Sequence, residues 1–291
     1  MQSVVAIMST VFDNNSKPAW CPGCGDFGIL NSVKKALVEL DRAPHQVALV
    51  SGIGQASKLP HYLKCNVFDG LHGRLLPAAQ GVKIANKDLT VIAVGGDGDN
   101  YGEGGNHFIH AIRRNVNITL LVHNNQVYGL TKGQASPTSD LGMVTKVQHY
   151  GVLLTPFNPI AIAIALDCGF VARSFSGDSA HLTATIKQAV NYNGFALVDI
   201  LQPCVTFNKI NTYKWYRERV YDVNTEAGYS PTDRIKAFAK SLEFETKIPI
   251  GIIYKKDKAS YIDAVPALKD QPLVKQTHQP GKISALLEEF V

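Results

Sequence analysis

Short apolar runs alternate along the chain with segments in which apolar residues recur at three- and four-residue intervals. The runs have the pattern of strands buried on both faces of a parallel sheet, and they cover residues 45–53, 89–94, 118–122 and 196–201. Helical spacing is clearest at Ile29, Leu30, Val33, Ala36, Leu37 and Leu40, and at Leu182, Ile186, Ala189 and Val190. Gly194 is placed to cap the second helix. The alternation predicts an α/β fold, a doubly wound, mostly parallel sheet flanked by helices.

The pattern changes after about residue 221, where the chain becomes mixed and carries several prolines and lysines. We therefore expect an α/β domain over residues 1–221, followed by a C-terminal extension over 222–291 that packs on a partner subunit. A length of 291 residues with 45% hydrophobic residues is ample for a large core.

Composition narrows the class of protein further. No apolar run reaches the length of a membrane span, and the first residues lack the basic start of a secretory signal, so we expect a cytoplasmic protein. The five cysteines are an odd number, which favours metal binding or burial over paired disulfides. A net charge of +5 without basic tracts indicates an acidic protein partner or anionic ligands rather than nucleic acid.

Polar and glycine-rich motifs follow directly after the predicted strands. They are Ser51-Gly52-Ile53-Gly54, Gly95-Gly96-Asp97-Gly98-Asp99, His123-Asn124-Asn125 and Gln202-Pro203-Cys204. Ligands of open α/β sheets bind beyond the carboxyl ends of the strands. We therefore expect one edge of the sheet to carry all four motifs.

The second motif has the features of an anion site. Its glycines allow close approach of a phosphate, and a helix begins shortly afterwards, at about His107. On its own this motif is equally typical of a plain turn. The segment Asn124-Asn125-Gln126-Val127-Tyr128-Gly129 lies one helix and one strand later. Asp97, Asn125 and the Val127 carbonyl then offer three oxygen ligands to Mg²⁺, and a pair of loops with this spacing is the recognised thiamine diphosphate motif.

The cysteines offer a second site. Cys21 and Cys24 are two residues apart at the start of a helix, a spacing that suits zinc, a redox disulfide or an iron–sulfur cluster. Cys204 ends a strand at the ligand-binding edge, so we favour a cluster held by Cys21, Cys24 and Cys204 over buried structural thiols. Cys168 is expected in the core, and Cys65 is ambiguous.

Several motifs together resemble the β subunit of 2-oxoacid:ferredoxin oxidoreductases, in order from about residue 20 to residue 216. They are Trp20-Cys-Pro-Gly-Cys-Gly25, Ser51-Gly-Ile-Gly54, Leu71-His-Gly-Arg74, Gly95-Gly-Asp-Gly-Asp99, Val127-Tyr-Gly-Leu-Thr-Lys-Gly-Gln134 with Ser136-Pro137-Thr138, and Gln202-Pro-Cys204. The resemblance implies thiamine diphosphate, Mg²⁺ and a 4Fe-4S cluster. It also implies coenzyme A, a 2-oxoacid, ferredoxin, and an α subunit that supplies the activating glutamate.

Site residues follow from the matching motifs. The cofactor-binding positions implied are Gly52, Ile53, Gly54, His72, Gly96, Asp97, Gly98, Asp99, Asn125, Val127, Tyr128, Gly129, Leu130 and Thr131. Lys58 and Lys132 become candidates for holding the substrate carboxylate or coenzyme A, with solvated surface lysines as the alternative. The Lys132-Gly-Gln134 segment resembles the 2-oxoglutarate and broad-specificity branches more than the pyruvate branch, and either direction of the reaction is open.

One position departs from the family. Members usually have a cluster cysteine directly after Ser-Gly-Ile-Gly, and this chain has Gln55 there. Because an amide oxygen is a poor substitute for a thiolate on iron, either Cys65 is the fourth ligand or the cluster is incomplete or altered. Competing interpretations are a pyruvate-specific enzyme, a non-redox thiamine diphosphate decarboxylase or synthase, and a zinc-stabilised binding protein.

Overall fold

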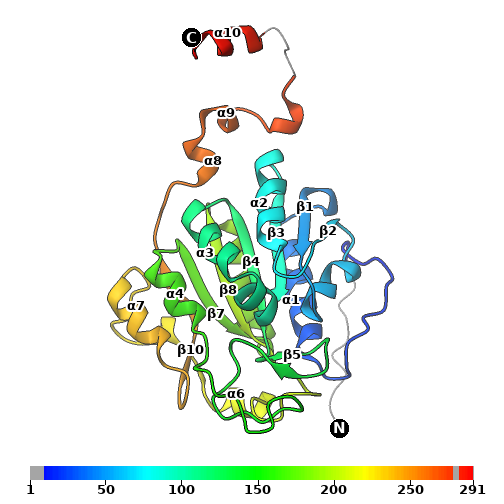
Figure 1. Ribbon diagram of the computed structural model, residues 1–291, viewed down its shortest axis with the longest axis vertical. Helices are drawn as coiled ribbons and strands as arrows, with labels where there is room; N and C mark the ends of the chain where they lie inside the picture. The colour runs from blue at the N-terminus through cyan, green and yellow to red at the C-terminus, as the bar shows by residue number, and fades with distance from the viewer. Residues whose placement is uncertain (1–9, 278–281, 291) are drawn as a thin grey trace.

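An eight-stranded sheet forms the centre of the molecule in the computed structural model, which describes residues 10–277 and 282–290 (Figure 1). Its strand order is β2-β1-β3-β4-β8-β7-β10-β9, and a separate two-stranded hairpin is formed by β5 and β6. The strands are β1 Val47–Ser51, β2 Asn66–Asp69, β3 Thr90–Gly96, β4 Ile118–Asn124, β5 Val127–Tyr128, β6 Gln134–Ala135, β7 Phe170–Phe175, β8 Phe195–Leu201, β9 Val220–Asp222 and β10 Ile248–Lys255.

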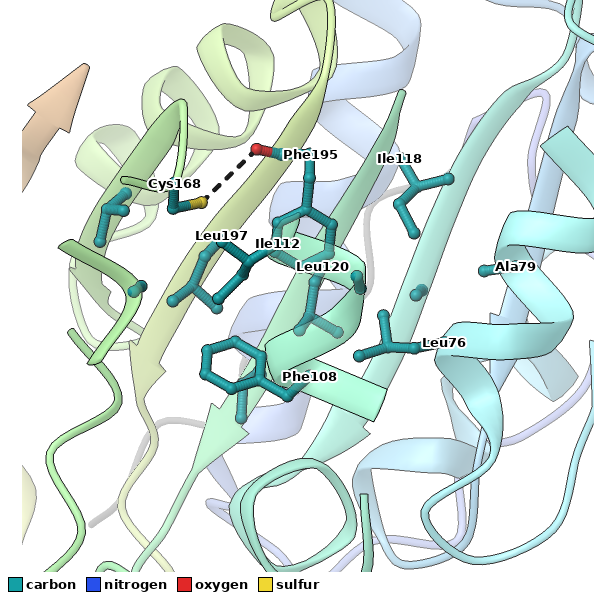
Figure 2. Close-up of a cluster of buried hydrophobic side chains, with 14 of the residues drawn as sticks. Leu76, Ala79, Phe108, Ile112, Ile118, Leu120, Cys168, Phe195 and Leu197 are labelled. Atoms are coloured by element: carbon teal, nitrogen blue, oxygen red, sulfur yellow. Dashed lines mark hydrogen bonds between the residues drawn. The ribbon is translucent and has the colours of Figure 1, made fainter. Parts of the chain in front are cut away.

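Helices cover both faces of the sheet. They are α1 Gly25–Glu39, α2 Leu75–Ala85, α3 Gly105–Arg114, α4 Pro159–Ala165, α5 Ser179–Asn191, α6 Tyr213–Arg217, α7 Arg234–Ser241, α8 Tyr261–Ala264, α9 Pro266–Lys269 and α10 Lys282–Glu288. On one face α2, α3 and α4 pack around residues such as Leu76, Phe108 and Leu197 (Figure 2). On the other face α1 and α5 pack through Val33 and Ile186. An apolar layer therefore packs on each face of the sheet and stabilises it.

The predicted α/β class and the four predicted strands are confirmed. The strand runs at 45–53, 89–94, 118–122 and 196–201 correspond to β1, β3, β4 and β8, which pair in parallel. The other four strands of the sheet, β2, β7, β9 and β10, were not predicted. In β7, buried Arg173 interrupts the run because it pairs with Asp199 of β8, at 3.7 Å. β2 lies at the edge, and all its residues are exposed.

The capping role expected of Gly194 is wrong. Helix α5 ends at Asn191 with Tyr192 as its cap, and Gly194 lies in the turn that enters β8. A Cβ atom at Gly194 would lie 2.6 Å from Asn115 Oδ1, which accepts a hydrogen bond from the Phe195 N–H. Glycine is therefore needed there for the close approach of the Asn115 side chain.

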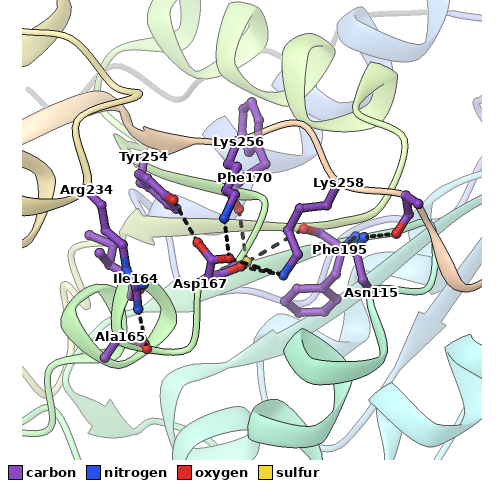
Figure 3. A network of polar contacts seen from close by, with 12 residues as sticks. Asn115, Ile164, Ala165, Asp167, Phe170, Phe195, Arg234, Tyr254, Lys256 and Lys258 are labelled. Carbon is purple, nitrogen blue, oxygen red and sulfur yellow. Dashed lines mark hydrogen bonds and ion pairs between the residues drawn. The ribbon is translucent and has the colours of Figure 1, made fainter.

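The expected boundary at residue 221 does not follow the sheet. β10 pairs antiparallel with β7, and β9 pairs with β10, so residues up to 255 belong to the α/β fold. Figure 3 shows how the end of β10 is fastened: Tyr254 and Lys256 both contact the Asp167 carboxylate, at 2.8 Å each. The prediction missed β10 although most of its residues are buried, because Pro249 and Gly251 interrupt its apolar run.

The segment after β10 leaves the sheet at the end opposite to β5 (Figure 1). It returns to the amino end of β3, where Lys275 forms an ion pair with Asp88 at 3.0 Å. Within residues 10–277 and 282–290, no helix combines the length and apolarity needed to cross a bilayer.

Candidate functional site

The predicted motifs lie at the carboxyl ends of neighbouring strands, as expected. In the parallel pair of β3 and β4, Gly96 is opposite His123, so the loops that begin at Asp97 and at Asn125 leave the sheet side by side. The first loop continues as a π-helical turn over Gly98–Glu103, a type of turn that is frequent at functional sites. The second continues into the β5–β6 hairpin.

The Asp97 carboxylate is buried at the start of the first loop. Ser136 and Thr138 donate hydrogen bonds to its Oδ2, at 2.5 Å and 2.6 Å. Burial is the largest effect on the acid and raises the pKa of Asp97 to about 6, because desolvation disfavours the charge. A cation beside Asp97 would reverse that effect. The carboxylate is thus held in place where a bound Mg²⁺ would lower its pKa again.

The two loops touch through Tyr128. A Cβ atom at Gly98 would lie 2.2 Å from the Tyr128 ring, so only glycine fits beneath this ring. The Tyr128 hydroxyl donates to the Glu103 carboxylate at 3.1 Å. Asn125 Oδ1 accepts a hydrogen bond from the Val127 N–H at 3.1 Å, which shapes the second loop. Asp97, Asn125 and Val127 are therefore assembled by loops in direct contact.

Asp99 ties three loops together. Its Oδ1 accepts hydrogen bonds from the N–H groups of Gly73 at 2.7 Å and Ile53 at 3.2 Å, and His72 Nδ1 lies 3.1 Å away. A Cβ atom at Gly52 would lie 2.0 Å from Asp99 Oδ2. The structure thus brings Gly52, Ile53, His72 and Asp99 together, and it gives Asp99 the role of a connector between the loops.

The turn of the β5–β6 hairpin carries the remaining predicted residues outward. Leu130, Thr131 and Lys132 are exposed, and Lys132 has a φ of +78°. A non-glycine residue in this region is strained. Lys58 is partly buried in the 3-10 helix Ala56–Tyr62, on a different loop. The strain at Lys132 favours a functional role for its side chain.

A second cavity lies beside the first loop pair and contains the predicted cluster cysteines. Its lining includes Cys21, Cys24 and Cys204, together with Gln55 and Asn125. The structure thus brings together three cysteines from the start of α1 and from the end of β8. The cavity also shares Asn125 with the diphosphate motif, so the two candidate sites adjoin.

Buried polar groups surround Cys24. The Cys24 thiol donates to Asp26 Oδ2 at 3.4 Å, and Gln202 Nε2 donates to the Cys24 sulfur at 3.3 Å. Asp26 in turn lies 2.6 Å from His123 Nδ1, and both side chains are buried. Burial and the nearby Asp26 carboxylate raise the pKa of Cys24 well above its ordinary value. The thiolate form therefore requires a positively charged partner such as iron.

Cys65 is not among the residues that line this cavity, so the structure gives no support to its expected place as fourth ligand. It directly precedes β2, and a backbone group of Leu49 in the middle of β1 lies beside its sulfur. The cavity lies instead beyond the carboxyl end of β1, where Gln55 is found. Cys168 is buried in the core, as predicted.

The arrangement of the cysteines bears on the kind of metal. Among the residues that the structure describes, no group of three or more His, Cys, Asp and Glu side chains converges to hold one ion. Structural zinc requires four ligands on a single ion, whereas the thiolates of an iron–sulfur cluster bind different irons.

Ser136, Thr138, Asp26 and His123 are site residues whose roles the sequence did not indicate. Ser136 and Thr138 stand in the quoted motif Ser136-Pro137-Thr138, which was a usable signal. Asp26 follows Cys24 by two positions, but nothing in the sequence connects it to His123, which lies 97 positions away.

Comparisons with known proteins agree with this geometry. A family model described as thiamine pyrophosphate enzyme, C-terminal TPP binding domain, matches residues 45–200. A second model, which describes the C-terminal part of the pyruvate ferredoxin oxidoreductase beta chain, matches residues 204–270. Subunit beta of 2-oxoacid:ferredoxin oxidoreductase 2 from Aeropyrum pernix is 49% identical, over 81% of this chain and 79% of the relative.

Two further proteins bear on the branch of the family. The 2-oxoglutarate oxidoreductase subunit KorB of Mycobacterium tuberculosis is 46% identical, over 68% of this chain and 53% of that protein. A solved structure of 2-oxoglutarate:ferredoxin oxidoreductase from Magnetococcus marinus, with 2-oxoglutarate, coenzyme A and succinyl-CoA bound, superposes with a TM-score of 0.88. It is 35% identical and covers 94% of each chain.

Proposed function

The chain belongs to the β subunits of 2-oxoacid:ferredoxin oxidoreductases, and on this premise we propose that it catalyses the coenzyme A-dependent oxidative decarboxylation of 2-oxoglutarate to succinyl-CoA and CO₂. The observation that carries the proposal is the contact between the Asp97 and Asn125 loops, directly beside a cavity with three cysteines. The same site would also serve the reverse carboxylation. The proposed enzyme is an α/β complex of the cytoplasm.

The residues of the Asp97 and Asn125 loops would hold the cofactor. Asp97, Asn125 and the Val127 carbonyl would bind Mg²⁺, and Ser136 and Thr138 keep the Asp97 carboxylate in one orientation. When bound, thiamine diphosphate supplies the electron sink that lets the substrate lose CO₂. The Tyr128 ring lies directly over Gly98 and would shield the bound diphosphate on that side.

The cysteine cavity explains why we favour a redox enzyme over a decarboxylase or synthase. A non-redox enzyme has no use for three thiols beside the cofactor loop. Cys21, Cys24 and Cys204 would hold an iron–sulfur cluster, which accepts electrons one at a time and would pass them to ferredoxin. Val127 and Cys204 pack in one apolar cluster, so cofactor and iron would be close neighbours.

The substrate assignment rests on the similar proteins and on Lys132. A 2-oxoglutarate enzyme must recognise a second carboxylate that pyruvate lacks, and Lys132 is exposed on the strained turn of the β5–β6 hairpin. We propose that Lys132 and Lys58 contact the substrate carboxylate or coenzyme A. A pyruvate-specific enzyme is the alternative.

An α subunit would bind beside the Asp97 and Asn125 loops and cover the stretch 141–154. The stretch 141–154 follows Ser136 and Thr138 and exposes several large apolar side chains, namely Leu141, Val144, Val147, Tyr150, Leu153 and Leu154. We call this stretch the apolar loop. Such a cluster is characteristic of a surface that binds another protein. Its position against Tyr128 and Ser136 would place the partner next to the cofactor.

The proposal is tested with the α/β complex purified without oxygen. Reduction of ferredoxin or a viologen is measured with coenzyme A against a panel of 2-oxoacids, and 2-oxoglutarate should give the highest kcat/KM. Turnover without any acceptor reduction would indicate a non-redox enzyme, and preference for pyruvate would refute the substrate assignment.

The cluster is tested separately through Cys21. Cys21→Ser should lower the iron content and the cluster absorbance while thiamine diphosphate binding stays unchanged, because Cys21 lines only the cysteine cavity. Cys65→Ser is the matched control and should keep its iron. Full iron content in Cys21→Ser would contradict the assignment.

A further inference from the structure

The cysteine cavity holds fewer thiols than a four-iron cluster requires. A 4Fe-4S cluster takes one cysteine thiolate on each iron, and the described residues that line this cavity include only Cys21, Cys24 and Cys204. The two remaining cysteines are held elsewhere: Cys65 lies beside Leu49, and the Cys168 thiol points to the Phe170 carbonyl at 3.5 Å. The residues therefore do not fit a cluster with four thiolates.

Gln55 lines the same cavity as the three cysteines. Its backbone carbonyl accepts a hydrogen bond from Trp20 Nε1 at 2.9 Å, and Trp20 directly precedes Cys21. The Trp20 ring packs against Tyr62 with ring centroids 4.8 Å apart. The backbone of residue 55 is thus fixed beside the cysteine pair independently of its own side chain.

The Gln55 side chain offers iron only a neutral oxygen. Its Oε1 is buried and has no hydrogen-bond partner among the described residues. A neutral amide oxygen is a hard, weak ligand, whereas iron in a sulfide cluster binds soft anionic thiolates. Asp26 also lines the cavity, but its carboxylate is engaged by the buried His123 Nδ1 at 2.6 Å.

The Gln55 side chain lies close to the loop that carries Asn125 and Gly129. A Cβ atom at Gly129 would lie 3.8 Å from Gln55 Cγ and 4.0 Å from Asn125 Nδ2. Gln55 therefore stands between the three cysteines and the loop that carries the predicted Mg²⁺ ligands.

We propose that the cluster of this chain has one iron without a thiolate ligand, at the corner nearest Gln55, and that mild oxidation releases this iron to leave a three-iron cluster. The inference rests on the cluster site of the proposed function. In the release, [4Fe-4S]²⁺ gives [3Fe-4S]⁺, Fe²⁺ and one electron, which a one-electron oxidant such as ferricyanide accepts. Each of the three irons that remain keeps one of the three cysteine thiolates.

The test uses the complex with the α subunit, purified without oxygen and treated with one equivalent of ferricyanide. Iron per chain is expected to fall from about four to about three, and the EPR signal of an oxidised three-iron cluster should appear. Fe²⁺ with dithionite should restore the lost iron. If the other subunit binds clusters of its own, their iron is subtracted by means of the Cys21→Ser complex.

Gln55→Cys supplies the missing thiolate and should keep about four irons, with no three-iron signal, under the same treatment. Gln55→Ala should lose its iron as the wild type does, and so should Cys65→Ser, because Cys65 lies outside the cavity. The oxidation of the wild type alone tests the inference even if Gln55→Cys does not fold.

Two results would overturn the inference, and they are distinguishable from failure of the proposed function. If the oxidised wild type keeps all its iron and shows no three-iron signal while the complex still reduces a viologen with 2-oxoglutarate, only the inference fails. If Cys65→Ser loses an iron that the wild type keeps, Cys65 is the fourth ligand. A wild type without iron refutes the cluster site itself.

Discussion

At the scale of single residues, the site depends on acids that are buried before any ligand binds. Asp97 is 1% exposed and is satisfied on one oxygen by two hydroxyl groups. Removing a charge from water is costly unless a partner compensates it. The fold therefore buries the Asp97 carboxylate at a cost in free energy, at the place where a divalent ion would stabilise its charge.

The first prediction concerns this carboxylate. Asp97→Asn keeps the shape of the side chain but removes its charge, so the affinity for Mg²⁺ and thiamine diphosphate should fall at least about a hundredfold. Isothermal titration calorimetry measures this directly. Asp88→Asn, at the exposed amino end of β3, is the matched control and should bind normally. Normal binding by Asp97→Asn would remove the basis of the site.

At the scale of elements, the β5–β6 hairpin carries proposed cofactor-binding residues and the proposed substrate-binding lysine. Its first strand carries Val127 and Tyr128, its turn exposes Lys132, and its return brings Ser136 to Asp97. The turn is closed by Gly133, where a Cβ atom would lie 2.8 Å from the Phe207 ring. The backbone conformation at residue 132 would suit glycine better than lysine. We therefore expect the Lys132 side chain to have a role of its own.

The second prediction follows from this strain. Lys132→Gly removes a side chain from a left-handed position, so the free energy of unfolding should rise by about 1 kcal/mol. The same change should raise the KM for 2-oxoglutarate or coenzyme A at least about tenfold, because a charged contact is lost. Urea unfolding and steady-state kinetics measure the two effects. Lys146→Ala, on the apolar loop, should change neither, and an unchanged KM in Lys132→Gly would assign Lys132 to the solvated surface.

The third prediction concerns helix α2. Lys83 near its end is buried and donates hydrogen bonds to the carbonyls of Lys87 and Leu89, at 2.6 Å each. Burial is the largest effect and lowers the pKa of Lys83 from 10.5 to about 8. Between these values the unfolded chain binds the proton and the folded chain does not, so stability rises with pH across this window.

The contribution of Lys83 is isolated by the variant Lys83→Met. The difference in unfolding free energy between wild type and variant should change by up to about 3 kcal/mol from pH 8 to pH 10.5, in favour of the wild type at higher pH. Urea unfolding at a series of pH values measures it. Lys214→Met, at an exposed lysine, should show no such slope. A flat difference for Lys83→Met would mean that the ammonium stays charged.

At the scale of the whole molecule, the candidate site lies at the carboxyl ends of the parallel strands. The C-terminal segment returns to the opposite end of the sheet. The apolar loop borders the candidate site, and Tyr150 within it is 96% exposed. Large apolar side chains are rarely left in water in such density. The apolar loop is therefore the surface on which we propose that the α subunit binds.

The fourth prediction tests this surface. Leu153→Asp combined with Leu154→Asp should weaken binding of the α subunit at least about tenfold, because each buried leucine contributes about 2 kcal/mol. Analytical ultracentrifugation of the mixed subunits measures the affinity. Thermal unfolding of the isolated chain should be unchanged, since both side chains are exposed. Leu242→Asp, on the exposed end of α7, is the control, and equal binding by all variants would place the partner elsewhere.

The sequence alone determined the α/β class and the pairing of the Asp97 and Asn125 loops. Both follow from local rules, because buried strands read as apolar runs and successive parallel strands bring their carboxyl ends together. The residues at those ends were therefore predictable without coordinates.

Only the tertiary structure decided the contacts between distant segments. Ser136 reaches Asp97 across 39 positions, and Gln202 reaches Cys24 across 178. It also placed β10 in the sheet and Cys65 away from the cysteine cavity. A residue type and its neighbours in sequence carry no information on such contacts, because they arise from how whole elements pack. The sequence already placed Gln55 where the family has a cysteine, and the fold showed which thiols line the same cavity.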